Sequence, residues 1–193
     1  MPFNIQDFAS NGLALGGARP SLFDVLITFP AGFSGDTSTP ASKLQFTCNA
    51  TQLPASSLGE IQVPYFGRKI KLAGDRTFQD WTITVMNDED FLVRDSIESW
   101  HTQINSIQNN LLSTSFDGNL YKSATGTITQ YGKDGSILKS YSMVNMFPVD
   151  VSQVDLSWNA TDQFESFQVT FAYDYWIPLP GQGTSVGVAV AGI

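Results

Sequence analysis

Two residue types that carry much of enzyme chemistry are almost absent from this chain of 193 residues, which has one cysteine, Cys48, and one histidine, His101. A single cysteine excludes an internal disulfide, and the two residues together fall short of the ligands that a zinc site needs. Cys48 lies on the apolar side of a predicted strand, which favours a buried, inert thiol. His101 lies off the apolar stripe of a predicted helix, which favours an ordinary surface residue. We therefore predict no metal and no cofactor.

Charge is also scarce, since Asp, Glu, Lys and Arg make up 15% of the chain, against roughly 25% in an ordinary soluble domain. A surface so poor in charge predicts that partners cover much of it, which favours an assembly subunit over a free monomer. The 18 acidic residues outnumber the 10 basic ones and give a net charge of −8. This balance argues against specific binding to nucleic acid, which depends on a basic patch.

Long hydrophobic runs are missing as well. No stretch approaches the ~18 apolar residues that suggest a membrane span, so we expect no membrane insertion by this chain. No basic start precedes an apolar run, as it would in a signal peptide. The two carboxylates of a glycoside hydrolase need only two acids in one cleft, and this possibility stays open.

What the sequence does contain is alternation of apolar and polar residues, the period of half-buried strands. Residues 43–51 and 167–176 alternate most clearly, and the turn at residues 132–135 joins two more strand-like runs. A helix is predicted at about residues 89–107, because apolar side chains recur there at three- and four-residue steps: Val93, Ile97, Trp100, Ile104 and Ile107. The sum is a mainly β (α+β) fold, an antiparallel β-barrel or sandwich of about seven to nine strands with one flanking α-helix.

Residues 66–91 are the most distinctive stretch of the chain. Four of the ten basic residues of the whole chain fall within ten positions there. The sequence Gly74-Asp75 predicts a turn between two strand-like runs. On spacing alone, a solvated strand face is as good an explanation for these charges as a contact with a neighbouring chain.

The run from Arg68 to Glu89, RKIKLAGDRTFQDWTITVMNDE, resembles the signature segment of the tail tube proteins of T-even-type contractile-tailed bacteriophages. Residues 18–25, ARPSLFDV, resemble the first strand of that family, and residues 167–176, FQVTFAYDYW, resemble its last strand. The resemblance covers roughly residues 18–176. Two departures stand out: the loop at residues 30–41 is longer, and the residues after Trp176 have no counterpart.

Composition rich in glycine and proline predicts an N-terminal arm (1–20) and a flexible C-terminal tail (177–193). The resemblance implies that the residues between them form a tail-tube β-barrel domain (21–176). It also implies a set of residues that make contacts between subunits or between rings, with ion pairs among the charged ones: Arg68, Lys69, Lys71, Asp75, Arg76, Asp80 and Trp81. The arm and the loops between residues 30 and 60 are the segments expected to stack one ring on another.

For function, the resemblance implies a structural subunit of a phage tail tube and no enzymatic activity. Hexameric rings would stack inside a contractile sheath to form the conduit for genome delivery. The expected partners are further copies of the chain, the tail sheath protein, and the baseplate and tail terminator proteins. Phage DNA would pass through the lumen without specific binding, and the acidic balance of the chain would keep it from adhering. The expected location is the virion tail, and the host cytoplasm during assembly.

Two alternatives remain open on the sequence. The chain could form the inner tube of a phage-like contractile injection system that delivers protein effectors, in which case fold and chemistry would be the same. It could instead be a soluble β-barrel enzyme or sugar-binding module, which predicts a concave pocket with convergent polar groups in a stable monomer.

Overall fold

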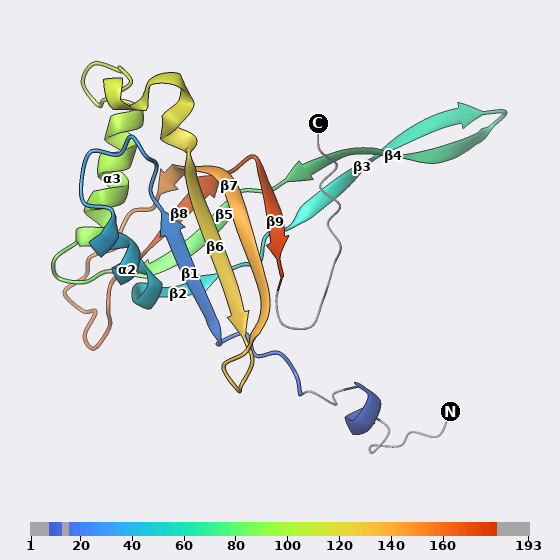
Figure 1. Cartoon of the computed structure of the whole chain (residues 1–193), viewed down its shortest axis with the longest axis horizontal. Helices are drawn as coiled ribbons and strands as arrows, with labels where there is room; N and C mark the ends of the chain where they lie inside the picture. The colour runs from blue at the N-terminus through green and yellow to red at the C-terminus, as the bar shows by residue number, and fades with distance from the viewer. Residues whose placement is uncertain (1–7, 13–15, 181–193) are drawn as a thin grey trace.

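The structure, a computed structural model, describes residues 8–12 and 16–180. Figure 1 shows a body of strands and helices from which one long hairpin projects. The strands are β1 (Phe23–Thr28), β2 (Cys48–Thr51), β3 (Ser56–Tyr65), β4 (Arg68–Phe78), β5 (Trp81–Met86), β6 (Ala124–Tyr131), β7 (Ile137–Val151), β8 (Ser166–Ala172) and β9 (Tyr175–Leu179). The helices are a π-helical turn η1 (Phe8–Gly12), α2 (Ser38–Thr47), α3 (Leu92–Ile104) and a 3₁₀ segment η2 (Thr114–Lys122).

All pairings between the described strands are antiparallel, and the strands run β1-β6-β7-β8-β5-β2 across the body, with β9 paired to β7. The predicted mainly β, antiparallel architecture with seven to nine strands is confirmed. The sequence left open whether the strands form a barrel or a sandwich, and the sheet is not closed into a barrel, because β1 and β2 stand at opposite ends of this order and do not pair with each other. Strand β7 joins the two parts of the sheet, because it changes partners along its length: its first part pairs with β6 and β9, and its last part pairs with β8.

The core lies between the sheet and helix α3. Along β5, Trp81, Ile83 and Val85 are buried in strict alternation, as the sequence predicts for a half-buried strand. Helix α3 contributes Val93, Ile97 and Trp100 to the same core cluster. The helix predicted at about 89–107 is thus present over a shorter range.

The two ends of α3 explain the difference. Phe91 has a left-handed backbone with φ 51°, which stops the helix from starting earlier, and the Leu92 amide donates to Asp90 Oδ1 at 3.1 Å. Asn105 is extended and ends the helix. The prediction that Ile107 extends the buried stripe is therefore wrong, since its side chain is 87% exposed.

Residues 38–47 form helix α2, although we predicted a loop that runs into a strand at 43–51. Asp36 Oδ1 accepts hydrogen bonds from the Ser38 amide at 3.0 Å and from the Thr39 amide at 3.4 Å, which caps the helix start. Pro40 and Leu44, four residues apart, are the buried positions, so the helical period decides the structure. Only Cys48–Thr51 remains a strand, and the structure therefore has a second α-helix that the sequence analysis missed.

The predicted single last strand at 167–176 is two strands. β8 ends at Ala172, and β9 begins at Tyr175 and pairs with a different part of β7. β9 continues to Leu179, so the predicted start of the tail at 177 falls inside a strand. Residues 1–7 and 13–15 of the predicted arm, and residues 181–193 of the predicted tail, lie outside the described residues.

Candidate assembly interface

Strands β3 and β4 form a two-stranded sheet of their own, separate from the body sheet. They are long, at 10 and 11 residues, and extend away from the body to one side in Figure 1. Every residue of β3 is exposed, and only Gly74 and Phe78 of β4 are half-buried. An isolated two-stranded hairpin is marginally stable in water at best. A projecting hairpin of this length therefore needs a cover that the described residues of this chain do not supply.

The hairpin turns at Phe66-Gly67, not at Gly74-Asp75 as predicted. Phe66 has φ 44° and Gly67 has φ 78°, the two positive values of a type I′ turn. Gly74 lies inside β4 opposite a register shift, where a Cβ would be only 3.1 Å from the carbonyl carbon of Gly59. The glycine thus permits a close approach of two backbones rather than a turn. A phenylalanine at positive φ is strained, and strain of this kind concentrates at functional positions.

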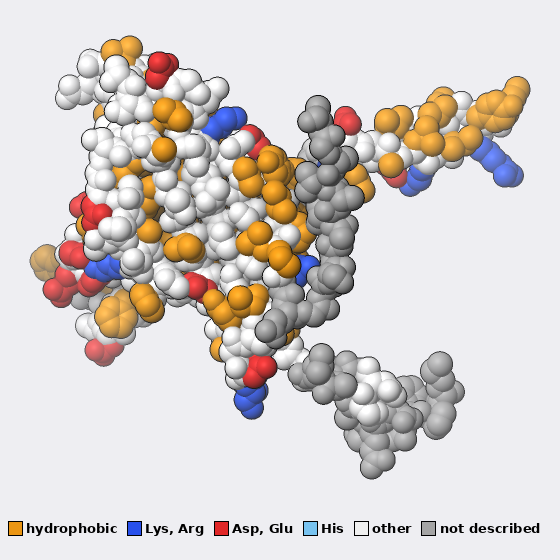
Figure 2. Space-filling view, in the orientation of Figure 1, with side chains coloured by type: hydrophobic (Ala, Val, Ile, Leu, Met, Phe, Trp, Pro, Cys, Tyr) orange, Lys and Arg blue, Asp and Glu red, His pale blue; other side chains and the backbone are white. Residues whose placement is uncertain are grey.

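The two faces of the hairpin differ in chemistry. Directly opposed residues share a face in an antiparallel pair, and the pairs Ile61–Leu72 and Val63–Ile70 place four apolar side chains together. Tyr65 continues this apolar face towards the tip and meets the Phe66 ring edge-to-face at 4.6 Å. Their exposed fractions run from 42% for Val63 to 91% for Phe66. Figure 2 shows this row of hydrophobic side chains along the hairpin.

The other face is polar and carries the pairs Glu60–Ala73 and Gln62–Lys71. Lys71 Nζ lies 3.0 Å from Glu60 Oε2, and Gln62 Nε2 donates to Glu60 Oε1 at 2.7 Å. These two bonds, the one from Lys71 foremost, lower the pKa of Glu60. The partner of Lys71 in this structure is thus in its own hairpin.

The remaining charges on the hairpin stand without ion-pair partners in the described part of the chain: Arg68, Lys69, Asp75 and Arg76. All four are exposed. Their position fits the expected contacts with other subunits, and they enter the proposal below.

Asp80 and Trp81 lie where the hairpin joins the body. Trp81 is 2% exposed, and its indole Nε1 donates to Thr51 Oγ1 and to the Gln52 carbonyl oxygen, both at 3.0 Å. Its side chain belongs to the core of its own subunit, so we leave it out of the proposed interface. Asp80 is exposed, and together with burial, the larger cause, it raises the pKa of Tyr173.

A second exposed apolar surface, which the sequence analysis missed, lies on the loop between β7 and β8, residues 152–165. Leu156 and Trp158 alternate with polar residues, which predicts a short strand. The structure has no strand there, and both side chains point to solvent, at 79% and 103% exposure. Phe164 in the same loop is 87% exposed. The available signal was the presence of two aromatic residues, Trp158 and Phe164, in a stretch that is mostly polar and acidic.

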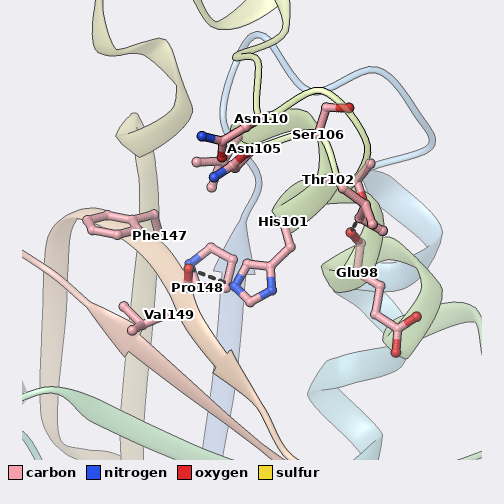
Figure 3. Close-up of a pocket in the computed structure, with 11 residues that line it drawn as sticks. Glu98, His101, Thr102, Asn105, Ser106, Asn110, Phe147, Pro148 and Val149 are labelled. Atoms are coloured by element: carbon pink, nitrogen blue, oxygen red, sulfur yellow. Dashed lines mark hydrogen bonds between the residues drawn. The ribbon is translucent and has the colours of Figure 1, made fainter.

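An open groove of about 710 Å³ lies between the end of α3 and the last part of β7 (Figure 3). His101 lines it, with Nε2 2.9 Å from the Pro148 carbonyl oxygen, so it is half-buried and hydrogen-bonded rather than an ordinary surface residue. Glu98 in the groove pairs with Arg94 at 2.7 Å. The two ionisable groups are thus bound to other partners than each other, which does not favour acid–base chemistry here.

Other kinds of site receive no support from the described residues. Cys48 is buried, and burial raises the pKa of its thiol to about 11, as expected of an inert cysteine. His, Cys, Asp and Glu side chains form no group of metal-binding size in the ranges 8–12 and 16–180. None of the helices described there has the length and apolarity to cross a membrane.

Comparison with known proteins identifies the family. The family model described as phage tail tube protein matches residues 18–178. The tail tube protein gp19 of Enterobacteria phage T4 is 37% identical over 160 residues, which cover 82% of this chain and 90% of that protein. The chain belongs to the phage tail tube protein family. A tail tube protein of Serratia phage KSP90 is 27% identical over 159 residues, covering 82% of this chain and 86% of the relative.

Solved structures agree on the fold of this tail tube protein. A chain in the baseplate of the anti-feeding prophage aligns with a TM-score of 0.59 at 12% identity, covering 84% of this chain and 95% of that one. A chain in the sheath–tube complex of an extracellular contractile injection system aligns with a TM-score of 0.52 at 18% identity, covering 91% and 97%. At these identities the likeness establishes the fold alone.

Family membership settles the class of function. The related phage proteins are structural tail tube proteins, so this tail tube protein is a structural component of the virion tail and not an enzyme. The enzyme and sugar-binding alternatives are thereby set aside.

Proposed function

We propose that six copies of this tail tube protein close into a ring, and that the rings stack inside a contractile sheath to form the conduit for the phage genome. The observation that carries the proposal is a subunit incomplete in two places. Its body sheet has edge strands that lack a partner on one side, and its hairpin has an apolar face that the described residues leave uncovered.

The two edge strands are β1 and β9, which lie at the ends of a four-stranded part of the sheet with the order β1-β6-β7-β9. Within the described residues, β1 pairs only with β6, and β9 pairs only with β7. Edge strands present unpaired backbone N–H and C=O groups that can pair with a strand of another chain. A head-to-tail contact that closes into a ring gives every edge strand such a partner. In our proposal β1 of one subunit therefore lies beside β9 of the next.

The two faces of this part of the sheet suggest which one lines the channel. Helix α3 packs into the core on one side, whereas no helix of the described residues covers β1, β6, β7 and β9 on the side towards the viewer in Figure 1. In our proposal the bare face of the sheet therefore lines the channel, and the side that carries α3 faces outward. Residues on the bare face are mostly hydroxyl-bearing or apolar, as register and exposure indicate: Leu26, Thr28, Thr125, Thr127, Thr129 and Ser142.

Figure 2 looks onto this bare face, where few charged side chains are visible. Asp24 is the acid in register with Thr129 on β6, and its Oδ2 accepts a hydrogen bond from Gln45 Nε2 at 2.6 Å. Proteins bind DNA largely through Lys and Arg side chains that replace the counterions of its phosphates, and a hydroxyl-lined channel lacks a row of such side chains. This supports passage of DNA without specific binding.

The hairpin supplies the contact between subunits or between rings. Its apolar face needs a cover, and Arg68, Lys69, Asp75 and Arg76 are exposed charges that a neighbouring copy can pair. Loss of one member of such a pair leaves the other charge without a partner, so pairs formed in the assembled tube make these positions sensitive to mutation.

The further partners follow from the same proposal. The tail sheath protein surrounds the tube, and the baseplate and tail terminator proteins meet its two ends. Assembly takes place in the host cytoplasm, and the finished tube resides in the virion tail. An effector-delivering injection system is the second candidate, because tube proteins of such systems share the fold. The higher identity to phage proteins favours the genome conduit, and the genes that neighbour this one would decide.

Electron microscopy of the purified full-length protein tests the proposal. We expect hollow filaments with six-fold symmetric cross-sections, formed spontaneously or after seeding with purified baseplates. A monomer that stays compact with every seed, while a T4-type tube protein polymerises in parallel, would overturn it.

A further inference from the structure

The exposed apolar loop at residues 152–165 has no role in the function proposed so far. We propose, on the basis of that function, that this loop is the docking surface for the hairpin tip of a neighbouring copy. The loop together with residues 87–91 is called the acceptor surface below, and the tip comprises residues 65–69.

The two surfaces match in apolar chemistry. The tip presents the aromatic rings of Tyr65 and Phe66, and the acceptor surface presents Leu156, Trp158 and Phe164, all more than 60% exposed. Contiguous exposed apolar side chains mark protein interaction sites, and aromatic residues are enriched at the centres of interfaces. Because Trp158 is 103% exposed, its side chain contributes no buried apolar area to the stability of the free subunit.

The two surfaces are also opposite in charge. The tip carries Arg68 and Lys69, which have no ion-pair partner in the described part of the chain. Residues 152–165 contain three acids, Asp155, Asp162 and Glu165, and no Lys or Arg. Complementary charges of this kind orient partners and fix the register of an interface.

Residues 87–91 extend the acidic side. The Asn87 amide donates to the Glu165 carbonyl oxygen at 2.9 Å, and Asn87 Nδ2 donates to Glu165 Oε2 at 3.2 Å, which joins the two segments. Asp88, Glu89 and Asp90 add three carboxylates, and Lys43 pairs with Asp88 and Asp90, at 2.6 and 2.5 Å. The acceptor surface therefore keeps an excess of negative charge.

The two surfaces lie at opposite ends of the molecule, and the loop is held in place at its base. The hairpin projects from one end of the molecule, and the loop between β7 and β8 lies at the other end, where acidic side chains gather in Figure 2. Two different surfaces at opposite ends form a head-to-tail contact that repeats from copy to copy. The loop is also fixed at its base, where the Ser152 amide donates to the Gln168 carbonyl oxygen and the Gln168 amide donates to Ser152 Oγ, both at 2.8 Å.

Disulfide trapping in assembled tubes tests the contact. Phe66→Cys and Trp158→Cys are combined in one chain, and tubes are oxidised mildly and run on a non-reducing gel. We expect a ladder of covalent multimers, with none from either single variant. The wild-type chain serves as a background control, because its Cys48 is buried. The matched control is Phe66→Cys with Lys133→Cys, an exposed position in the turn between β6 and β7, which should give no ladder.

A charge exchange provides a second, independent readout. Reversal of the tip alone, Arg68→Glu with Lys69→Glu, should raise the critical concentration for tube formation about tenfold or more. The same holds for reversal of the loop alone, Asp155→Lys with Asp162→Lys. A chain with both reversals should return to within about threefold of the wild type, because the coupling between two touching surfaces is non-additive.

The outcomes separate this inference from the proposed function. If wild-type tubes form but the 66–158 pair gives no ladder and the two reversals add without rescue, the acceptor surface is wrong and the tube function stands. A Trp158→Ala chain that forms normal tubes but no longer binds purified sheath protein would assign the loop to the sheath and also overturn the inference. If the wild-type chain forms no tubes under any seed, the proposed function itself fails.

Discussion

Strands β4 and β5 follow one another in the chain and show the same alternation of apolar and polar residues, yet they end in opposite environments. In β5, Ile83 and Val85 are 0% exposed, and in β4, Ile70 and Leu72 are 53% and 52% exposed. β5 lies between β2 and β8, whereas among the described strands β4 pairs with β3 alone. The comparison teaches that alternation shows that a face needs a cover, but not whether the cover comes from the same chain or from another.

The largest effect should come from a matched pair of truncations that compares the two strands directly. Ile83→Ala removes a fully buried side chain and should lower the free energy of unfolding of the monomer by about 2–5 kcal/mol. Ile70→Ala should change it by less than about 0.5 kcal/mol, because surface positions contribute little. Urea denaturation of the unassembled subunits measures both. Equal losses would mean that the hairpin is part of the folded core.

A second pair sharpens the contrast between the two faces of the hairpin. Val63→Asp places a carboxylate on the apolar face, which should cost about 2–4 kcal/mol per subunit in the tube, since a buried charge needs a partner. Gln62→Asp makes the same change on the polar face and should be tolerated. Sedimentation of polymerised protein at a series of concentrations compares the two variants. Normal assembly by Val63→Asp would show that this face stays in water.

Charge reversal on β4 tests the hairpin ion pairs. Asp75→Lys or Arg76→Glu should leave the subunit folded, with an unchanged circular dichroism spectrum, but prevent polymerisation. We expect a cost of about 1–3 kcal/mol per contact, because a charged hydrogen bond is replaced by repulsion. Electron microscopy gives the readout, with Lys133→Glu as a control for net charge. Normal tubes from both hairpin variants would remove these residues from the interface.

The smallest effect concerns the body, away from the hairpin. Hydrogen bonds from the Thr39 and Ser38 side chains, together with those from their amides, lower the pKa of Asp36 from its ordinary 3.8 to about 2. A lowered folded-state pKa stabilises the fold above pH 3.8, and this contribution is lost as the pH falls through about 2. The melting temperature of Asp36→Asn should therefore fall less steeply over that window than that of the wild type. Parallel pH curves would show that the cap at α2 depends on geometry and not on charge.

Sequence patterns predicted those elements in which the local spacing of apolar residues and their burial in the tertiary structure favour the same secondary structure. Helix α3 is an example, because Val93, Ile97 and Trp100 recur at helical spacing and all three are buried. Helix α2 was missed because alternating Leu44, Phe46 and Cys48 suggested a strand, although Phe46 is 80% exposed. The Asp36 cap and the four-residue step from Pro40 to Leu44 were the better guides.

The candidate site was predicted in part. The resemblance drew attention to residues 68–81 but did not distinguish contact residues from core residues, because both belong to one motif. Trp81 is a core residue, and Lys71 has Glu60 as a partner in its own hairpin. The acceptor surface was missed because the alternation of Leu156 and Trp158 with polar residues predicts a strand. Only the three-dimensional structure shows that these residues lie in an exposed loop.

The sequence by itself determined the antiparallel, mainly β class, the long helix and the family, because alternation, helical spacing and motif are properties of neighbouring residues. The tertiary structure decided that the sheet stays open, that the chain turns at Phe66-Gly67, and that one alternating strand is buried while the next is bare. These outcomes depend on which segments meet in space. Contacts between distant residues leave no mark on the local pattern of either one.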